Sequence, residues 1–368
     1  MKIGILTLPL HTNYGGILQT YALQTLLKQM GYEAFFIDRI IPPIKLITLL
    51  KCHLGSILHG RGIYKEIKTD QKLLDFYAQK LLDFRCKYIQ PSTMPIGTKL
   101  DLRKLGEMDF DAFIVGSDQV WRGDYIQGLE DTYFLSFVNN KRVKKIAFAA
   151  SFGKNSLDLN IAKNKIKYSK CLQQFEAISV RENSGISLCR KEFNVNAVQL
   201  VDPTLLLDAL EYESLIRKEN EIIETGELCV ILLDINEEKN RIIQAVSMET
   251  NLKPYAINKS PTNTNQLISI PSWLKSIKDS KYVITDSFHG CVFSIIFNKD
   301  FIVIGNEERG IDRFTSLLEL FNLSERLVST EEEALSIILK PINYSSVNGK
   351  INKYRDEAKH FLNKALDN

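Results

Sequence analysis

Short, continuous apolar runs alternate with amphipathic stretches along the chain, which is typical of parallel strands covered by helices on both faces. In the first half the pattern predicts strands at residues 2–8, 34–38, 110–116, 145–150, 177–180 and 197–201. A second series follows at residues 229–233, 254–257, 282–285 and 301–304. The pattern therefore predicts an α/β protein built on parallel sheets.

The two series of strands predict two domains. A chain of 368 residues is longer than one hydrophobic core usually supports. Acidic residues gather between positions 219 and 227, and the strand pattern restarts directly after them. We expect an N-terminal domain at residues 1–218 with a divergent excursion at 41–100, a C-terminal domain at 227–345, and a terminal helix at 346–368.

Charge and composition exclude several classes of protein. Lys plus Arg exceed Asp plus Glu by only three, which is too little for a global attraction to nucleic acid. No apolar run reaches the roughly 18 residues of a membrane span. The opening residues read as a strand and loop without a cleavage site, and the six cysteines form no CxxC pair. We therefore expect reduced thiols and a cytoplasmic protein.

Residues 41–72 depart from the pattern, with two prolines, apolar runs and mostly basic charges. One interpretation is an amphipathic segment that touches an anionic membrane surface, which would place the protein at the periphery of the inner face of the membrane. The other, which we favour, is a helical excursion packed on its own domain.

The strongest motif is residues 282–290, where an apolar strand runs into a small-residue turn and then an apolar helix. Ligands of parallel α/β sheets bind at the carboxyl ends of strands, which is where this turn lies. Ser287 can cap the helix and leave the amides of His289, Gly290 and Cys291 to face an anion. His289 can transfer a proton, and the alternative is a histidine that serves only in capping or packing.

A second strand ends in Arg181, at the same predicted edge of the sheet. A guanidinium group matches a carboxylate or a phosphate with two parallel hydrogen bonds. The alternative for Arg181 is an ion pair with Glu182 or with a carboxylate from a neighbouring helix.

A third strand opens into a polar turn that contains Asp118 and Trp121. Asp118 could accept a hydroxyl proton or bind a sugar, and Trp121 could stack on one. The alternative is an Asx-type turn with a tryptophan in the core. Other residues expected at this edge, as candidates for binding an acceptor, are Asn13, Tyr14, Gly15, Gly16 and Ser151.

The sequence gives little support for a dinucleotide site, a phosphate loop or a zinc site. Gly15, Gly16 and Asp38 suggest a dinucleotide site, but the spacing G-x-G-x-x-G is absent, as is a G-x-x-x-x-G-K-[ST] phosphate loop. The spacing of the chain's histidines and cysteines is not that of a zinc site. We therefore assign no metal and no cofactor.

Seven segments, in order, resemble the polysaccharide pyruvyl transferase family. They are NYGGILQTYAL (13–23), FDAFIVGSDQVW (110–121), FAASFG (148–153), ISVRE (178–182), LVDPTLLL (200–207), VITDSFHG (283–290) and RFTSLLELFNL (313–323). The resemblance implies two Rossmann-like domains that face each other across a cleft, as in GT-B glycosyltransferases. It also implies transfer of the pyruvyl unit of phosphoenolpyruvate to a glycan, either free or lipid-linked, with a ketal as product and phosphate released.

By this resemblance Arg181 and His289 contact phosphoenolpyruvate, together with Ser287, Phe288 and Gly290. Some members carry an arginine before the histidine, where this chain has Ser287 and Phe288, so one phosphate contact is expected either to be absent or to come from Arg309 or Arg313. His289 would donate the proton and Asp118 would accept one from the acceptor hydroxyl. Two alternatives remain: a glycosyltransferase that uses a nucleotide sugar, and a noncatalytic protein that binds an anion or a glycan.

Overall fold

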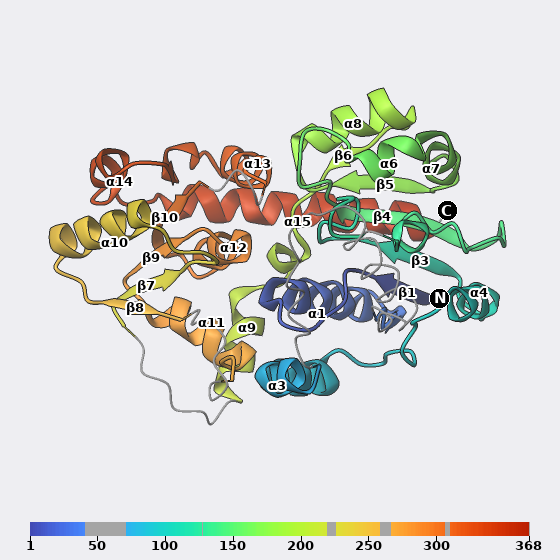
Figure 1. Cartoon of the computed structure of the whole chain (residues 1–368), viewed down its shortest axis with the longest axis horizontal. Coiled ribbons are helices and arrows are strands. Elements are labelled where there is room, and N and C mark those ends of the chain that lie inside the picture. The colour runs from blue at the N-terminus through green and yellow to red at the C-terminus, as the bar shows by residue number, and fades with distance from the viewer. Residues whose placement is uncertain (41–70, 127, 219–225, 258–265, 306–309, 368) are drawn as a thin grey trace, which may run out of the picture.

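Two parallel sheets, each covered by helices, make up the protein (Figure 1). The structure is a computed structural model, and it describes residues 1–40, 71–126, 128–218, 226–257, 266–305 and 310–367. Residues 41–70, which carry most of the candidate membrane segment 41–72, and Arg309 lie outside this description. No helix within it is long and apolar enough to cross a membrane.

The first sheet has six strands in the order β2-β1-β3-β4-β5-β6, and neighbouring strands pair in parallel. The strands are β1 (Lys2–Leu6), β2 (Glu33–Phe36), β3 (Ala112–Val115), β4 (Lys144–Ala150), β5 (Ala177–Val180) and β6 (Val198–Gln199). Its helices are α1 (Tyr14–Gln29), α3 (Gln71–Tyr88), α4 (Lys99–Glu107), α5 (Glu130–Tyr133), α6 (Leu159–Lys163), α7 (Lys165–Leu172) and α8 (Asn183–Phe193).

The second sheet has five parallel strands in the order β11-β10-β9-β7-β8. They are β7 (Leu228–Ile231), β8 (Pro254–Ala256), β9 (Tyr282–Thr285), β10 (Asp300–Ile304) and β11 (Leu327–Val328). The elements between and around the sheets are η1 (Pro203–Leu206), α9 (Ala209–Arg217), α10 (Glu237–Thr250), α11 (Ile270–Asp279), α12 (Phe288–Ile296), α13 (Asp312–Phe321), η2 (Ser324–Arg326), α14 (Glu331–Ile337) and α15 (Tyr344–Asp367).

The predicted α/β class with two parallel sheets is confirmed, and every predicted strand has a counterpart. Several apolar runs, such as 2–8 and 197–201, yield shorter strands because their last residues already belong to the loops that follow the strands. The two-residue strand β11 was not predicted, since it is too short to give an apolar period.

One hydrophobic cluster joins the two halves. It contains Ile5 of β1, Leu18 of α1, Phe293 of α12 and Leu362 of α15, so side chains from both sheets share a core. Every residue of α12 is buried, which explains why this helix is apolar around its whole circumference. Two further clusters lie on the outer faces of the sheets, one on the first sheet and one on the second.

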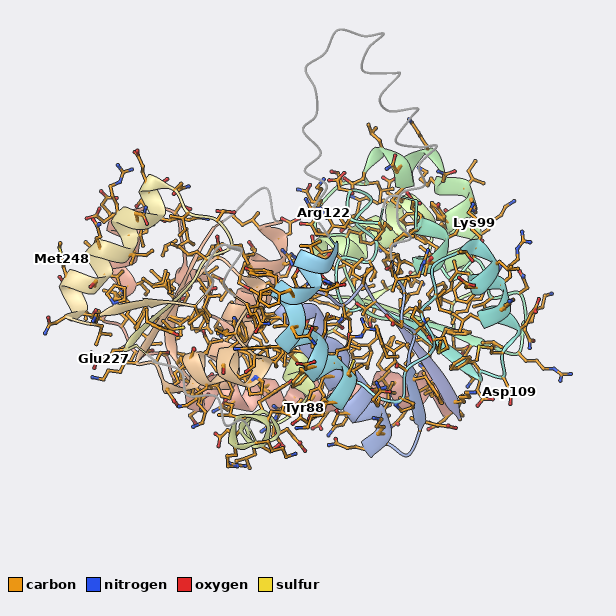
Figure 2. All side chains as sticks on the ribbon, turned by 60° about the horizontal axis from the view of Figure 1, so that its bottom comes forward. Tyr88, Lys99, Asp109, Arg122, Glu227 and Met248 are labelled. Atoms are coloured by element: carbon orange, nitrogen blue, oxygen red, sulfur yellow. The ribbon has the colours of Figure 1, made fainter. Side chains whose placement is uncertain are left out.

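Helices α3 and α15 each contact both halves of the protein. Figure 2 shows α3, which ends at Tyr88, lying across the junction, and the Tyr77 carbonyl of α3 accepts a hydrogen bond of 2.9 Å from the Leu267 amide of the second half. The long helix α15 runs from the second half to the first (Figure 1), where Phe361 packs on Phe148 of β4. The opposed carboxyl ends of the two sheets are thereby held in a fixed relation.

Candidate active site

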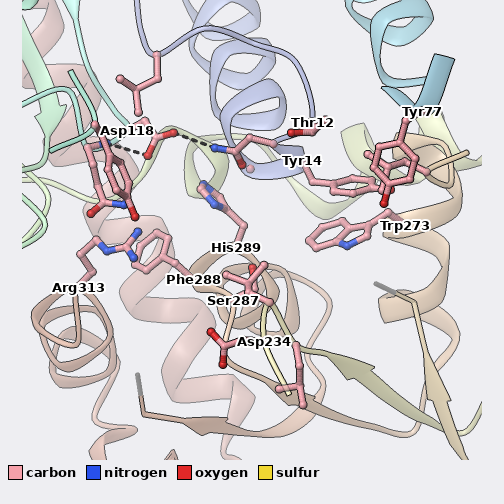
Figure 3. A pocket seen from close by; sticks show the side chains of 18 of the residues that line it. Thr12, Tyr14, Tyr77, Asp118, Asp234, Trp273, Ser287, Phe288, His289 and Arg313 are labelled. Carbon is pink, nitrogen blue, oxygen red and sulfur yellow. Dashed lines mark hydrogen bonds between the residues drawn. The ribbon is translucent and has the colours of Figure 1, made fainter. Parts of the chain in front are cut away.

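A cavity of about 750 Å³ lies between the two halves, at the carboxyl ends of β1, β3, β7 and β9. Its walls come from loops and helix starts of both halves (Figure 3). The first half contributes Leu8, Thr12, Asn13, Tyr14, Gly15, Tyr77, Asp118, Gln119 and Tyr125. The second half contributes Leu232, Leu233, Asp234, Ile235, Leu267, Trp273, Ser287, Phe288, His289 and Arg313.

Two helices begin at this cavity, one from each half. In α1, the Asn13 side chain caps the helix by accepting a hydrogen bond of 3.0 Å from the Gly16 amide. In α12, the Ser287 hydroxyl accepts from the Gly290 amide at 3.4 Å. The first amides of a helix have no acceptor inside the helix, and its positive dipole end attracts anions. The cavity is therefore suited to a negatively charged ligand.

The amides expected to face an anion need one correction. The Gly290 amide bonds to the Ser287 side chain, and the Cys291 amide donates to the Ser287 carbonyl at 3.0 Å. Both amides are thus occupied within the helix. The amides at the very start of α12, those of Phe288 and His289, are the ones that helix geometry leaves without an internal acceptor.

His289 lines the cavity from the first turn of α12 and packs closely against α1. A methyl group built on Gly15 would lie 1.8 Å from the Nδ1 atom of His289, so only glycine leaves room for the ring. The other ring nitrogen, Nε2, is buried and lies 3.6 Å from Oδ2 of Asp202. Residues distant in sequence thus hold the imidazole in one orientation.

Asp202 connects His289 to Arg181. This carboxylate is fully buried, and its Oδ2 atom accepts a hydrogen bond of 2.7 Å from the Arg181 guanidinium. Burial alone would raise the pKa of Asp202, but His289, Arg181 and the Thr204 hydroxyl outweigh it and hold this pKa well below its usual range. Asp202 is therefore a permanent negative charge behind the imidazole.

Arg181 and His289 thus meet around one carboxylate, but Arg181 does not line the cavity. Its side chain is only 2% exposed and lies behind Phe288, with the guanidinium carbon 4.3 Å from the ring centre. Glu182, the partner considered from sequence, instead accepts hydrogen bonds from the Phe152 and Gly153 amides. The ion pair of Arg181 is with Asp202, a residue that the sequence analysis did not select.

Arg313 is the arginine on the cavity wall. Its guanidinium carbon lies 5.4 Å from the centre of the Phe288 ring, so both Arg181 and Arg313 contact that ring within cation–π range. Burial, followed by the like charge of Arg181, lowers the pKa of Arg313 to about 10. Burial is the larger cause, so the guanidinium is poorly solvated, and an anionic ligand in the cavity would stabilise its charge.

Asp118 and Asn13 form a polar bridge on the first half's side of the cavity (Figure 3). Asp118 Oδ2 accepts from Asn13 Nδ2 at 3.1 Å, and Asp118 Oδ1 accepts from the Gln119 amide at 2.8 Å. Gly16 lies beneath this bridge, with its amide bound to Asn13. Asp118 thus reaches the cavity already oriented.

Two residues predicted to bind the acceptor, Trp121 and Ser151, do not line the cavity. Trp121 is 1% exposed, donates its Nε1 hydrogen to the Tyr133 carbonyl and stacks on Phe134, so it belongs to the core. Ser151 is fully buried, and its hydroxyl accepts a hydrogen bond from the Gly153 amide. Neither residue lines the cavity, because each strand continues into a turn that folds back over the sheet.

Several residues of the site were not selected from sequence, among them Asp202, Trp273 and Asp234. Asp202 lies in a segment that carried the family resemblance, but an isolated aspartate gives no sign of what it pairs with. Trp273 looks like an ordinary apolar position of an amphipathic helix. Asp234 lines the cavity from the loop after β7 and pairs with Lys239. Among the described residues, no group of three or more His, Cys, Asp or Glu could hold a metal ion.

Two facing α/β halves, each built on a parallel sheet, with a cavity between the carboxyl ends of the sheets, are the architecture of the GT-B fold class. The chain belongs to the polysaccharide pyruvyl transferase family, which it matches over residues 13–308. This is a family of transferases that act in polysaccharide pyruvylation, as the sequence motifs indicated.

Solved structures agree on the fold. The UDP-N-acetylglucosamine 2-epimerase of Rickettsia bellii is similar with a TM-score of 0.51 at 10% identity, covering 100% of this chain and 96% of that one. An S. aureus MnaA–UDP co-structure gives a TM-score of 0.53 at 12% identity, covering 99% and 97%. Identities this low show a shared fold alone. No curated protein matches the chain in sequence.

Proposed function

We propose that this protein transfers the pyruvyl unit of phosphoenolpyruvate to a sugar of a capsular, extracellular or cell-wall polysaccharide precursor, forming a ketal and releasing phosphate. The observation that carries the proposal is the position of His289. It lies on the wall of a cavity that is also lined by Arg313 and by the first residues of two helices, and its ring lies beside the buried Asp202–Arg181 pair.

The chemistry requires a site that holds a trianion and delivers one proton. A proton from His289 to the methylene carbon of phosphoenolpyruvate makes the adjacent carbon electrophilic, and an acceptor hydroxyl then bonds to that carbon. Cleavage of the C–O bond to phosphate releases phosphate and makes the same carbon electrophilic again, and a second hydroxyl of the same sugar bonds to it to complete the ketal. Of the two protons that the hydroxyls lose, one restores that of His289 and the other leaves with phosphate. Arg313 and the start of α12 would bind the phosphate, and the ionised Asp202 would stabilise a positive imidazole ring.

Asp118 is the proposed base for the acceptor hydroxyl. Its carboxylate lines the cavity and is held by Asn13 and the Gln119 amide, so it is positioned before substrate binds. Arg181 positions the site through Asp202 and Phe288. The proposal places the reaction in the cytoplasm, where phosphoenolpyruvate is made.

The first test measures donor binding. By calorimetry, phosphoenolpyruvate should bind the wild-type protein, and Arg313→Ala should weaken this binding about 10- to 100-fold because a charge-assisted contact is lost. Arg217→Ala is the matched control, since Arg217 is an exposed arginine of α9 whose side chain is 64% exposed. Equal affinity in both variants would contradict the assignment of Arg313.

The second test measures turnover as phosphate release from phosphoenolpyruvate, with a panel of free and lipid-linked oligosaccharides. Release should require an acceptor, and His289→Ala should abolish it while donor binding persists. His360→Ala, at an exposed histidine of α15, is the control. Binding of nucleotide sugars in place of phosphoenolpyruvate would favour a glycosyltransferase. Binding of phosphoenolpyruvate without release on any acceptor would favour a noncatalytic protein.

A further inference from the structure

The cavity has two chemically different ends, and His289 lies between them (Figure 3). Asp118 and Arg313 lie on one side of the imidazole in this view. Tyr14, Tyr77 and Trp273 gather on the other. The Arg313 guanidinium at one end suits the phosphate and carboxylate of a small anion, whereas three aromatic side chains line the other end.

The aromatic end is a fixed surface built from both halves. The rings of Tyr14 and Trp273 stack with centres 5.4 Å apart and planes 21° apart. The Tyr14 hydroxyl donates a hydrogen bond of 2.8 Å to the Ile268 carbonyl, just before α11. Trp273 is almost fully buried and Tyr14 is half-buried. Tyr14 nevertheless lines the cavity, so part of its ring surface is accessible to a ligand.

Tyr14 also lies beside the proposed proton donor. It is followed directly by Gly15, whose Cα position is in contact with the imidazole of His289. Tyr14 and His289 line the same cavity, so a ligand that packs on the Tyr14 ring can extend towards the imidazole. A pyranose has an apolar face of C–H groups and a rim of hydroxyls, so it can pack on an aromatic ring and still present hydroxyls to neighbouring polar groups.

We propose that the aromatic end, formed by Tyr14, Tyr77 and Trp273, is the subsite for the acceptor sugar, with the apolar face of the pyranose packed on Tyr14. This inference rests on the proposed function and names the binding site of its second substrate. It assigns to Tyr14 and Trp273 the stacking role that sequence had suggested for Trp121. The donor then occupies the Arg313 end, and the two substrates meet at His289.

Tryptophan fluorescence tests the subsite without turnover. The chain has two tryptophans, and Trp121 lies in the core away from the cavity. Methyl glycosides of glucose, galactose, mannose, N-acetylglucosamine and N-acetylmannosamine are titrated into the wild-type protein and into Trp273→Phe. At least one glycoside should change the wild-type emission and leave that of the variant unchanged. A response that persists in Trp273→Phe, or no response to any glycoside, would overturn the proposal.

Kinetics provide the second measurement, with the acceptor that supports phosphate release. Tyr14→Ala should raise the KM for acceptor about 5- to 10-fold and leave the KM for phosphoenolpyruvate unchanged, because only the aromatic contact is lost. Tyr14→Phe keeps the ring and should restore the acceptor KM. Tyr14→Leu replaces Tyr14→Ala if that variant does not fold. An unchanged acceptor KM in the variants without the ring would overturn the subsite.

The two proposals fail in different ways. A glycoside-dependent change in Trp273 emission without phosphate release on any acceptor would reject pyruvyl transfer and keep the sugar subsite. Phosphate release on a glycan acceptor with no dependence on Tyr14 would keep pyruvyl transfer and reject the subsite.

Discussion

At the scale of single residues, the contact between Gly15 and His289 sets the geometry of the site. The imidazole occupies the space that a side chain at position 15 would fill. Any larger residue must displace the ring from this position, in which its Nε2 atom lies 3.6 Å from Oδ2 of Asp202. The glycine is needed for this close approach between the two halves, since it lies in the first turn of α1, where alanine is a good helix former.

Gly15→Ala is therefore expected to lower kcat by about 100-fold or more, because displacing a proton donor by an ångström has an effect of this size. The melting temperature should fall little if the imidazole rotates away from its place. Gly349→Ala is the control, since a methyl group there meets no atom within 4 Å. Unchanged kcat in Gly15→Ala would show that the position of His289 does not matter. Steady-state phosphate release and thermal unfolding provide the measurements.

At the scale of elements, the short helix η1 begins after Asp202, whose buried carboxylate lies beside Arg181 and His289. Asp202 precedes η1 and caps it by accepting a hydrogen bond of 3.0 Å from the Thr204 amide. The same carboxylate neutralises Arg181 at the end of β5. Removing the negative charge leaves a buried arginine without its partner, which is more costly than losing a surface ion pair.

Asp202→Asn is expected to lower the free energy of unfolding by about 3 to 5 kcal/mol at neutral pH. The pKa of Asp202 in the folded state lies below the value near 3.9 of an unfolded chain. Its stabilising contribution is therefore complete above about pH 4 and declines as the pH falls further. Urea unfolding at pH 7 and pH 3 should show a smaller difference between wild type and variant at the lower pH.

The control for this effect is Asp356→Asn, at an exposed position of α15. It should be neutral at both pH values. A difference between Asp202→Asn and the wild type that is equally large at pH 3 and pH 7 would argue against an ionised Asp202 in the folded protein.

At the scale of the whole molecule, α15 ties the two halves together. Arg355 of this helix donates hydrogen bonds of 2.6 Å to the carbonyls of Leu205 and Leu207, directly after the Asp202 turn. Near the other end of the helix, the Tyr344 hydroxyl bonds to the Lys299 carbonyl, just before β10 of the second sheet. The relative placement of Arg181 and His289 depends on this connection as well as on their own ion pairs.

Arg355→Ala is expected to lower the free energy of unfolding by about 2 to 4 kcal/mol, since two carbonyls lose a charged donor. Its melting temperature should fall together with kcat, because the junction that supports Asp202 loosens. Lys353→Ala, on the same helix with a side chain 70% exposed, should be neutral in both measurements. If Arg355→Ala lowers the melting temperature but leaves kcat unchanged, the contacts of α15 do not determine the geometry of the site.

The sequence by itself determined the class of fold, the family and the edge of the sheets where the site lies. Apolar periodicity fixes strands and helices locally, and parallel strands bring their carboxyl ends to one edge whatever the details of packing. For this reason His289, Asp118 and Tyr14 could be selected before the structure, and all three line the cavity.

Only the tertiary structure decided which polar groups pair and which face the ligand. Asp202 takes Arg181 as its partner, Arg313 replaces Arg181 on the cavity wall, and Trp273 occupies the aromatic position expected of Trp121. These choices depend on contacts between residues from 21 to more than 250 positions apart, such as the bonds from Arg181 to Asp202 and from Tyr14 to Ile268. A one-dimensional pattern carries the period of each element, but the partner of a buried charge is fixed by the packing of elements from both halves of the chain.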